Sequence, residues 1–289
     1  MRYDFIRQQQ KAYPITVLCK VMEVSRSRYY QYLKTDHSIV DKDFELLSEV
    51  RRIHNETRGS YGSRRTSTGL RSRGYNVGRY RARTMMKKAG VTVKHSRKFR
   101  VTTDSKHNLP VAPNLLERNF QVDRPNTVWC SDITYLWTME GWLYLATVID
   151  LFSRKVVGWA MSNRIKSSLA TDALAMAYWR RKPEKGLIHH SDRGSQYASG
   201  DYQNLLRSYG MICSMSRKGD CWDNAVAESF FHSMKTEWTA GMLYRNRSDA
   251  RSDVIHYIEM FYNSNRLHSY LNYKNPNDFE KNFMWAKAA

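Results

Sequence analysis

The sequence predicts an α/β domain, with a mixed five-stranded sheet and helices on both of its faces, preceded by all-α helix-turn-helix-type units. Two observations predict this division. Residues 1–122 carry 26 basic and 10 acidic side chains, whereas residues 123–289 carry 21 and 17. The second part also contains several apolar runs of strand length, which later alternate with helical periodicity, as in a sheet covered by helices.

The composition of the 289 residues excludes several classes of protein. Hydrophobic residues make up 42%, enough for a folded core rather than a disordered chain. No run of about 18 uncharged apolar residues is present, which excludes a membrane span, and the start lacks the apolar stretch of a signal peptide. The four cysteines lie far apart, which argues against a zinc ribbon or a disulfide framework and favours a cytoplasmic protein.

The net charge of +20 is densest between residues 51 and 100, which hold 16 basic side chains and one acid, Glu56. So many charges of one sign repel one another unless phosphates neutralise them. This favours a nucleic-acid partner over the alternative that the charges form an ordinary solvated surface. Interleaved tyrosines and glycines argue against an amphipathic membrane helix, which would show a continuous apolar face.

Residues 1–40 are expected to form a helix-turn-helix-like unit. Two short helices are predicted within residues 14–34, the first with an apolar face made by Ile15, Leu18, Cys19 and Met22. Ser25 is a suitable N-cap for the second helix, whose Arg26 and Arg28 can reach DNA. From this pattern alone, an ordinary helical hairpin explains the segment about as well.

Residues 41–98 are expected to form a basic helical DNA-binding domain. Its first helix is predicted from the spacing of Phe44, Leu47, Val50 and Ile53. A second helix begins near Ser63, and a third runs from Arg79 to Lys88 and is closed by Gly90. Candidate DNA contacts in this domain are Arg64, Arg65, Arg79, Arg81 and Arg83. Residues 99–122, with two prolines, are expected to be a linker with a short helix around Leu115.

Residues 123–240 are predicted to form the α/β core. Short connections favour antiparallel pairing of the first three strands, at 127–136, 142–150 and 155–161. Helices and strands then alternate, at 168–181 (helix), 187–190 (strand), 200–209 (helix), 212–215 (strand) and 222–238 (helix). This order matches the RNase H-like fold, in which the first and fourth strands are neighbours. A helix over 249–262 and a tail are expected to pack on this core, within residues 241–289.

Three acids stand at the ends of core elements: Asp132 in the first strand, Asp192 after the fourth, and Glu228 in the long helix. In the predicted topology they converge, and converging carboxylates raise one another's pKa unless a cation neutralises them. Oxygen ligands suit Mg²⁺ or Mn²⁺ rather than zinc. Two such ions can activate a water or a 3′ hydroxyl and stabilise the leaving oxygen in phosphoryl transfer. Such acid spacings also arise by chance, so the surrounding motifs carry the argument.

Other polar and aromatic residues have simpler interpretations. Asp150 and Asp223 are expected to be cap or turn residues, and His189 and His190 are expected to be packed or to orient neighbouring groups rather than bind metal. Three tryptophans are most simply core aromatics, namely Trp129, Trp142 and Trp159.

Three segments, Trp129–Tyr135, His190–Tyr197 and Asp223–Phe231, closely resemble signatures of the insertion-sequence-three family of bacterial transposases. These are DDE enzymes related to retroviral integrases. Lys235, seven residues after Glu228, matches a basic position of that family. The spacing of the residues between Tyr262 and Phe279 is similar to the family's C-terminal pattern.

The resemblance implies that Asp132, Asp192 and Glu228 bind metal, with two Mg²⁺ or Mn²⁺ ions at the site, and that Lys235 contacts the transposon end. Asn224 would point toward the same cleft, since residues 224, 228 and 235 share a helix face. The activity implied is that of a transposase, which binds the terminal inverted repeats of an insertion sequence. It would cut a strand there and direct the 3′ hydroxyl at another phosphodiester, leading to DNA integration.

The resemblance also implies partners and a location. These are double-stranded DNA of the transposon ends and target, a homo-oligomer on DNA, and an upstream-frame helix-turn-helix and coiled-coil partner or fusion, in the bacterial cytoplasm at the nucleoid. An alternative is a non-enzymatic repressor-like DNA-binding protein or a partner-dependent truncated product of the same element. A decayed repressor is expected to have lost a carboxylate, whereas all three are present. An RNA–DNA hybrid nuclease would not need the basic units.

Overall fold

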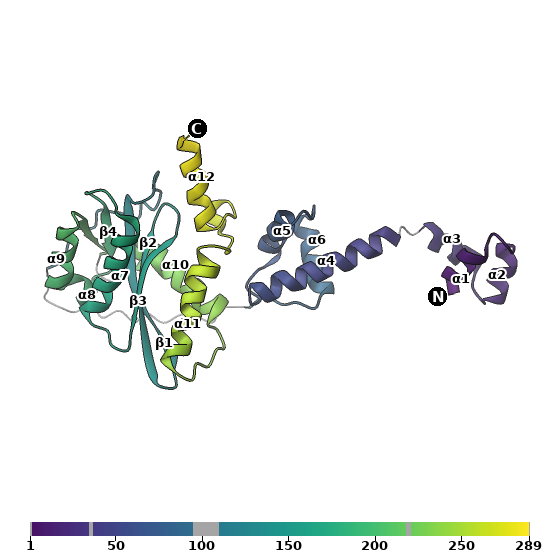
Figure 1. Ribbon diagram of the computed structural model, residues 1–289, viewed down its shortest axis with the longest axis horizontal. Coiled ribbons are helices and arrows are strands. Elements are labelled where there is room, and N and C mark those ends of the chain that lie inside the picture. The colour runs from purple at the N-terminus through teal and green to yellow at the C-terminus, as the bar shows by residue number, and fades with distance from the viewer. Residues whose placement is uncertain (1, 35–36, 95–109, 218–220, 289) are drawn as a thin grey trace. The chain divides into compact units, whose positions relative to one another are not determined.

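A computed structural model describes residues 2–34, 37–94, 110–217 and 221–288 (Figure 1). The chain divides into two compact units, Met1–Glu56 with Tyr61–Thr92, and Thr57–Ser60 with Val93–Ala289. The predictions for residues 99–109 fall outside the described residues. None of the described helices is long and apolar enough to cross a membrane.

The first unit begins with three short helices, α1 (Arg2–Gln9), α2 (Ile15–Val21) and α3 (Arg26–Lys34). They enclose a small core of four buried residues, Ile6, Leu18, Cys19 and Tyr29. The hydroxyl of Ser25 accepts the backbone N–H of Arg28 at 3.1 Å, so the predicted N-cap is confirmed. Sequence reasoning missed α1, whose only buried residue is Ile6.

The unit continues with α4 (His37–Glu56), α5 (Ser63–Ser72) and α6 (Arg79–Lys88). The predicted starts of α5 and α6 are confirmed, but α4 begins before residue 41, the boundary expected between two domains. Its buried stripe consists of Leu46, Val50 and Ile53, which lie at the i, i+4, i+7 spacing of one helix face. The predicted stripe is wrong at Phe44, which is 73% exposed because it lies two residues from Leu46, on the other side of the helix.

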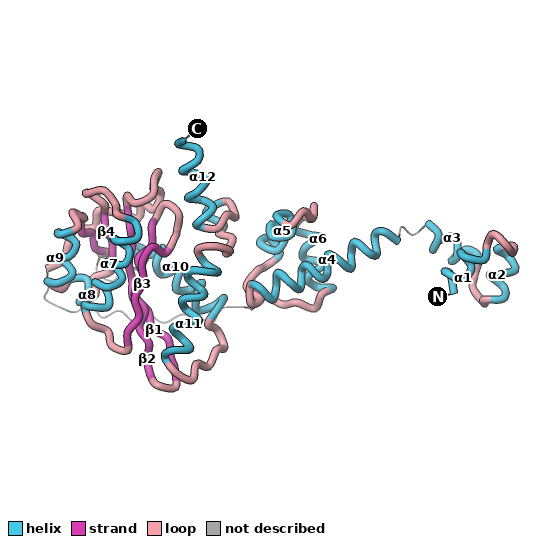
Figure 2. The backbone as a smooth tube through the Cα atoms, viewed as in Figure 1, coloured by secondary structure: helices cyan, strands magenta, loops and turns pink. Residues whose placement is uncertain are grey.

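The second unit contains a five-stranded sheet of order β3-β2-β1-β4-β5 (Figure 2). Its strands are β1 (Val128–Thr138), β2 (Gly141–Asp150), β3 (Val156–Ser162), β4 (Ile188–Ser191) and β5 (Ile212–Met215). The first three pair antiparallel, and β4 pairs parallel with both β1 and β5. The predicted mixed sheet, with its first and fourth strands adjacent, is confirmed.

Helices cover both faces of the sheet, as predicted (Figure 1). One face carries α7 (Ser167–Arg181), α8 (Ser195–Ala198) and α9 (Gly200–Ser208), and the other carries α10 (Ala225–Ser233) and α11 (Arg247–Ile255). Gly158 of β3 allows α7 to approach, because a Cβ there would lie 2.3 Å from the carbonyl oxygen of Ala173. Trp129 is fully buried in this core and Trp159 is partly buried, but Trp142 is 43% exposed, so its assignment to the core is wrong.

The two last predicted helices contain irregular turns. The predicted helix 222–238 consists of a 3₁₀ turn (Cys221–Asn224), α10, and a π-helical turn (Met234–Trp238). The predicted helix 249–262 is α11, which continues as a second π-helical segment (His256–Tyr262). Single π-helical turns are often found at functional sites.

The C-terminal tail contains a helix that sequence reasoning missed, α12 (Pro276–Ala288). The ring of Phe152 packs on those of Phe279 and Phe283, at centroid distances of 5.1 and 4.7 Å. The side chain of Glu280 is buried and forms an ion pair with Arg181, with an N–O distance of 2.9 Å. The tail therefore packs on the α/β unit through both apolar and ionic contacts.

Residues 110–122, predicted as part of a linker with a helix around Leu115, form no helix and lie against the α/β unit instead. The side chain of Leu116 is buried, and the N–H of Leu115 donates to Ser214 Oγ at 2.9 Å. Arg154 Nη2 donates to the carbonyl oxygen of Phe120 at 3.1 Å. Apolar burial and these hydrogen bonds fix a segment whose prolines suggested a free linker.

Candidate active site

The register of two parallel strands sets Asp132 beside Asp192. Along β1 and β4, Cys130 pairs with His190, and Ser131 pairs with Ser191. The residue that follows the last of these pairs is an aspartate in both segments, Asp132 within β1 and Asp192 directly after β4. Neighbouring strands lie about 4.8 Å apart. The sheet itself therefore brings together two carboxylates that are 60 residues apart in the sequence.

Backbone amides hold both aspartates in position. The N–H of Ile133 donates to Asp132 Oδ1 at 2.8 Å, and the N–H of Gly194 donates to Asp192 Oδ1 at 2.9 Å. A Cβ at residue 194 would lie only 3.0 Å from Asp192 Oδ1, so a glycine suits this turn. Arg193 fixes the same turn through its Nε, which donates to the carbonyl oxygen of Ser216 at 2.6 Å.

Glu228 lies on the exposed side of α10, the helix that packs against β1. Asn224, at the start of this helix, is only 4% exposed, and its Nδ2 donates to the carbonyl oxygen of Ser131 at 3.2 Å. The prediction that Asn224 faces DNA therefore needs correction. Its side chain is buried because it ties the start of α10 to β1, and in this way it positions Glu228 relative to Asp132.

The pKa values of these acids show that they share one electrostatic environment. Burial raises the pKa of Asp132 well above its usual value, and the charges of Asp192 and Glu228 raise it further. Burial and the charge of Asp192 likewise raise the pKa of Glu228. Within the described ranges, no three His, Cys, Asp or Glu side chains are grouped closely enough to hold a metal ion.

Lys235 belongs to the same site. Its Nζ lies 4.8 Å from the centre of the Tyr135 ring, close enough for a cation–π contact. Its charge acts to lower the pKa of Asp132, while burial lowers the pKa of Lys235 itself. The structure thus places this lysine beside the acids and not among the solvated charges of a helix surface.

A buried ion pair holds the π-helical turn that contains Lys235. Arg266 is 3% exposed and donates from Nε and Nη2 to the two carboxylate oxygens of Glu237, at 2.6 and 2.7 Å. The same Nη2 donates to Ser233 Oγ at 3.1 Å. Ser233 and Glu237 lie two residues before and after Lys235, so Arg266 fixes the turn from both sides. Arg266 lies within the C-terminal pattern between Tyr262 and Phe279, but the sequence alone indicated no role for it.

A second ionic cluster surrounds Asp223, which was predicted to be a cap or turn residue. Its buried carboxylate accepts hydrogen bonds from Arg217 Nε at 3.0 Å, Arg118 Nε at 3.1 Å and Asn114 Nδ2 at 2.9 Å. The hydrogen bond from Arg217 is the main reason that the pKa of Asp223 lies far below its usual value. Asp223 therefore joins the segment before β1 and the end of β5 to the start of α10, a wider role than a local cap.

The remaining polar predictions of the core are confirmed. His189 is fully buried and contacts Ser131 Oγ at 2.8 Å, and His190 contacts Ser214 Oγ at 2.9 Å. Burial lowers the pKa of these histidines to about 3 and about 4, so both are neutral, packed residues. Asp150 is a turn residue, because it accepts the backbone N–H groups of Asn126 and Phe152.

The arginines predicted to contact DNA differ in their surroundings. Arg81 donates to Asp43 at 3.1 Å, and the guanidinium of Arg65 lies 5.6 Å from the ring of Tyr61. The other five are exposed, and in the described part of the chain none has an acidic side chain within ion-pair distance: Arg26, Arg28, Arg64, Arg79 and Arg83.

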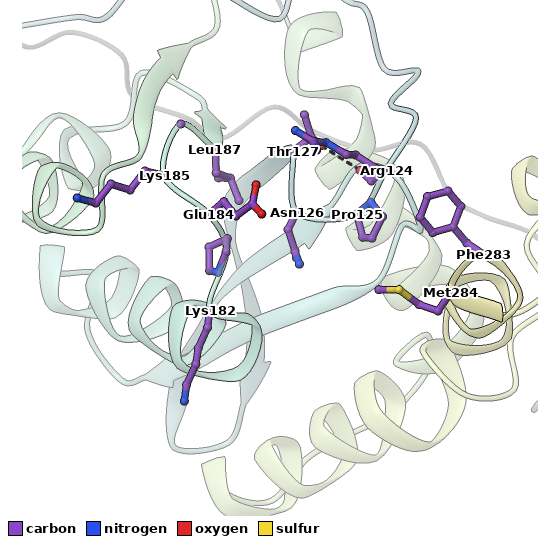
Figure 3. A pocket seen from close by; sticks show the side chains of 12 residues that line it. Arg124, Pro125, Asn126, Thr127, Lys182, Glu184, Lys185, Leu187, Phe283 and Met284 are labelled. Atoms are coloured by element: carbon purple, nitrogen blue, oxygen red, sulfur yellow. Dashed lines mark hydrogen bonds between the residues drawn. The ribbon is translucent and has the colours of Figure 1, made fainter. Parts of the chain in front are cut away.

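A hollow of about 340 Å³ lies away from the acids (Figure 3). Its lining includes Thr127 and Leu187, which directly precede β1 and β4, and Met284 of α12. Asp192 follows the opposite end of β4. This hollow is therefore separate from the candidate active site.

Comparison with known proteins gives three family matches along the chain. An HTH-like domain matches residues 41–99, and integrase core domains match residues 122–221 and 209–276. The catalytic core domain of HTLV-2 integrase, solved in complex with magnesium, aligns with a TM-score of 0.42 and 17% identity, covering 54% of this chain and 97% of that one.

Two relatives match nearly the whole chain. The 31 kDa protein of insertion element IS600 from Shigella sonnei is 44% identical over 267 residues, which cover 92% of this chain and 98% of that protein. The transposase InsF for insertion sequence IS3A from Escherichia coli (strain K12) is 42% identical over 283 residues, or 97% of this chain and 98% of that one. The predicted family is confirmed: this chain belongs to the IS3 family of insertion-sequence transposases.

Proposed function

We propose that this transposase binds the terminal repeats of its own element and cuts and joins DNA strands by metal-dependent phosphoryl transfer. The observation that carries the proposal is the strand register that sets Asp132 beside Asp192, with Glu228 in the same electrostatic environment. Neighbouring acids that repel one another are stabilised by a cation. A site of this kind, in a chain with a net charge of +20, suits a polyanionic substrate.

The donor set fits Mg²⁺ or Mn²⁺, because it consists of hard carboxylate oxygens. Asp132 and Asp192 would hold the metal with side chains that backbone amides already orient. Glu228, exposed on α10 and within the electrostatic influence of Asp192, would be the third ligand. Two ions, when bound, would activate the attacking oxygen and stabilise the leaving oxygen.

Lys235 would bind a phosphate of the element end next to the scissile bond. Its ammonium lies beside Asp132 and above the ring of Tyr135, where it can offset the negative charge that DNA brings toward the acids. Arg266 and Glu237 hold the turn that presents it. In this role Lys235 would supply a cation where the DNA backbone approaches the carboxylates.

The first unit would hold double-stranded DNA of the ends through exposed arginines of α3, α5 and α6, which include Arg28, Arg64 and Arg83. Contacts of this kind to phosphates position a protein on DNA. Insertion of a whole element requires both of its ends to be joined to one target. We therefore include in the proposal a homo-oligomer on DNA, with a helix-turn-helix and coiled-coil partner from an upstream reading frame.

The test is a strand-cleavage assay on DNA that carries the element's terminal repeat. In Mg²⁺, the variants Asp132→Asn, Asp192→Asn and Glu228→Gln should each lose cleavage while retaining binding of the end in a gel-shift assay. Asp172→Asn, at an exposed acid of α7, is the matched control and should cleave normally. Wild-type cleavage by any of the three variants would refute the assignment. Binding without cleavage by the wild-type protein would instead favour the repressor-like alternative.

A further inference from the structure

The hairpin formed by β1 and β2, whose turn lies at the end of the sheet (Figure 2), carries exposed aromatic side chains. Trp137 is 58% exposed and Trp142 is 43% exposed, and their ring centroids lie 4.8 Å apart in an edge-to-face arrangement. The ring of Trp142 also lies 4.8 Å from that of Tyr135. We call Tyr135, Trp137 and Trp142 the aromatic row. Trp137 and Trp142 are exposed and Tyr135 is partly buried, and apolar side chains that are grouped at a surface in this way, rather than scattered singly, can mark an interaction site.

The hairpin is held rigidly to the rest of the unit. Arg247 donates from Nε to the carbonyl oxygen of Trp142 at 3.1 Å, and its backbone N–H donates to Glu140 Oε2 at 3.0 Å. The N–H of Met139 donates to the carbonyl oxygen of Tyr244 at 3.0 Å. Because the hairpin is fixed in this way, the rings are presented to a ligand with little loss of conformational entropy on binding.

Lys235 connects the aromatic row with the candidate active site. Asp132 and Trp137 lie five residues apart on β1, about 17 Å at about 3.3 Å per residue, and their side chains point to opposite faces of the sheet. A DNA strand advances about 3.4 Å per nucleotide along the helix axis, so this length corresponds to about five nucleotides. Between these two residues, the ammonium of Lys235 lies over Tyr135. Lys235 therefore joins the row to the acids, and a nucleic-acid strand that follows this path would pass around the edge of β1 beyond its last pair with β4.

We propose that the aromatic row stacks on unpaired bases of the DNA strand that enters the active site. This inference rests on the proposed function, because it names the part of the substrate that the hairpin binds. Aromatic rings stack on bases of any sequence, but only where the bases are unpaired or splayed from the duplex. Lys235 lies over the Tyr135 ring, and this positive charge favours a polyanionic strand over the surface of a second copy of this basic chain.

The experiment compares two DNA probes with the full-length protein in EDTA, so that no strand is cut. Each probe is a duplex with a five-nucleotide single-stranded tail, and the tail carries either ordinary bases or abasic sugars with the same phosphates. Fluorescence anisotropy gives the Kd of each. We expect the wild-type protein to bind the tail with bases at least about fivefold more tightly than the abasic tail, since stacking strengthens binding by about 5- to 150-fold per base.

The double variant Trp137→Ala/Trp142→Ala should bind the two probes equally and match the wild-type affinity for the abasic tail. Trp179→Ala is the control, because Trp179 is 66% exposed on α7, and it should keep the preference for bases. Trp137→Phe, which retains a ring, should keep most of it. Circular dichroism verifies that each variant is folded. If the double variant is unstable, the single variant Trp137→Ala, at an exposed position, is compared with the wild type instead.

A double variant that still prefers bases would overturn the proposal. A variant that loses self-association in light scattering but keeps the preference would also overturn it and would identify a second copy as the occupant. If the proposed function is wrong, the result is a different one: the wild-type protein does not cut DNA in Mg²⁺, with either probe. The preference for bases is measured without metal and is independent of that outcome.

Discussion

Replacing Arg266 by methionine should destabilise the protein strongly and disturb the turn that presents Lys235. The guanidinium makes two hydrogen bonds to Glu237, at 2.6 and 2.7 Å, and the two side chains are only 4% and 12% exposed. Arg266→Met would leave the Glu237 carboxylate buried without its cation. Breaking a buried pair in this way costs about 3–5 kcal/mol, which for a unit of this size corresponds to a melting temperature lower by about 6–20 °C.

Thermal unfolding, followed by circular dichroism, measures this loss for Arg266→Met, Glu237→Gln and the double variant. The double variant should lose less stability than the sum of the single variants, because removing both charges leaves neither one unpaired. Cleavage of end DNA should fall in Arg266→Met at a temperature where the variant is folded. A melting temperature within 2 °C of wild type, or strictly additive losses, would refute the view that this pair fixes the turn.

Three further predictions concern other charges. Lys235→Met should slow cleavage of end DNA without weakening Mn²⁺ binding in calorimetry, and an unchanged rate would make this lysine dispensable. Arg217 holds the pKa of Asp223 below its ordinary value of 3.8, so the native state binds a proton there less readily than the unfolded state. The wild type should therefore lose more stability than Asp223→Asn in melts as the pH falls below about 4, and parallel pH profiles would contradict this. Arg83→Ala should make the slope of log affinity against log salt less negative by about 1, whereas Arg73→Ala, which removes an ion pair to Glu49, should lower the melting temperature instead. The reverse pattern would exclude the phosphate assignment.

The fold of the α/β unit could be predicted because its signals are local and repeated. Apolar runs of strand length gave all five strands to within a few residues, and the short connections predicted the antiparallel pairing of the first three. The position of Asp132 beside Asp192 followed from that strand order, since adjacency in a sheet is a property of topology and needs no knowledge of individual side-chain contacts.

The contacts that complete the site could not be predicted in this way. Arg266 and Glu237 are 29 residues apart, and no local sequence pattern predicts that these two charged side chains form a buried ion pair. Asn224 was assigned to the DNA-facing side by helical periodicity. The chain forms a 3₁₀ turn there instead, and the side-chain amide of Asn224 donates to a backbone carbonyl oxygen of β1. In each case a tertiary contact overrode a local regularity.

Burial was the least predictable property of the aromatic residues. Trp142 and Trp129 have equally apolar side chains, yet one lies near the turn of the hairpin and the other at the centre of the sheet. Phe44 is exposed although its spacing suits a helix, because the neighbouring stripe through Leu46 faces the partner helices. Apolar character predicts a tendency to be buried, but the position of the residue within its element decides the outcome.

The most direct test of the central claim asks whether Asp192 holds the metal. In Asp192→Cys the carboxylate is replaced by a softer thiolate, which suits Mg²⁺ poorly and Mn²⁺ better. Cleavage of end DNA by this variant is predicted to be absent in Mg²⁺ and partly restored in Mn²⁺, while DNA binding is retained. Cleavage in Mg²⁺ at the wild-type rate would contradict the claim that this carboxylate is a metal ligand of the active site.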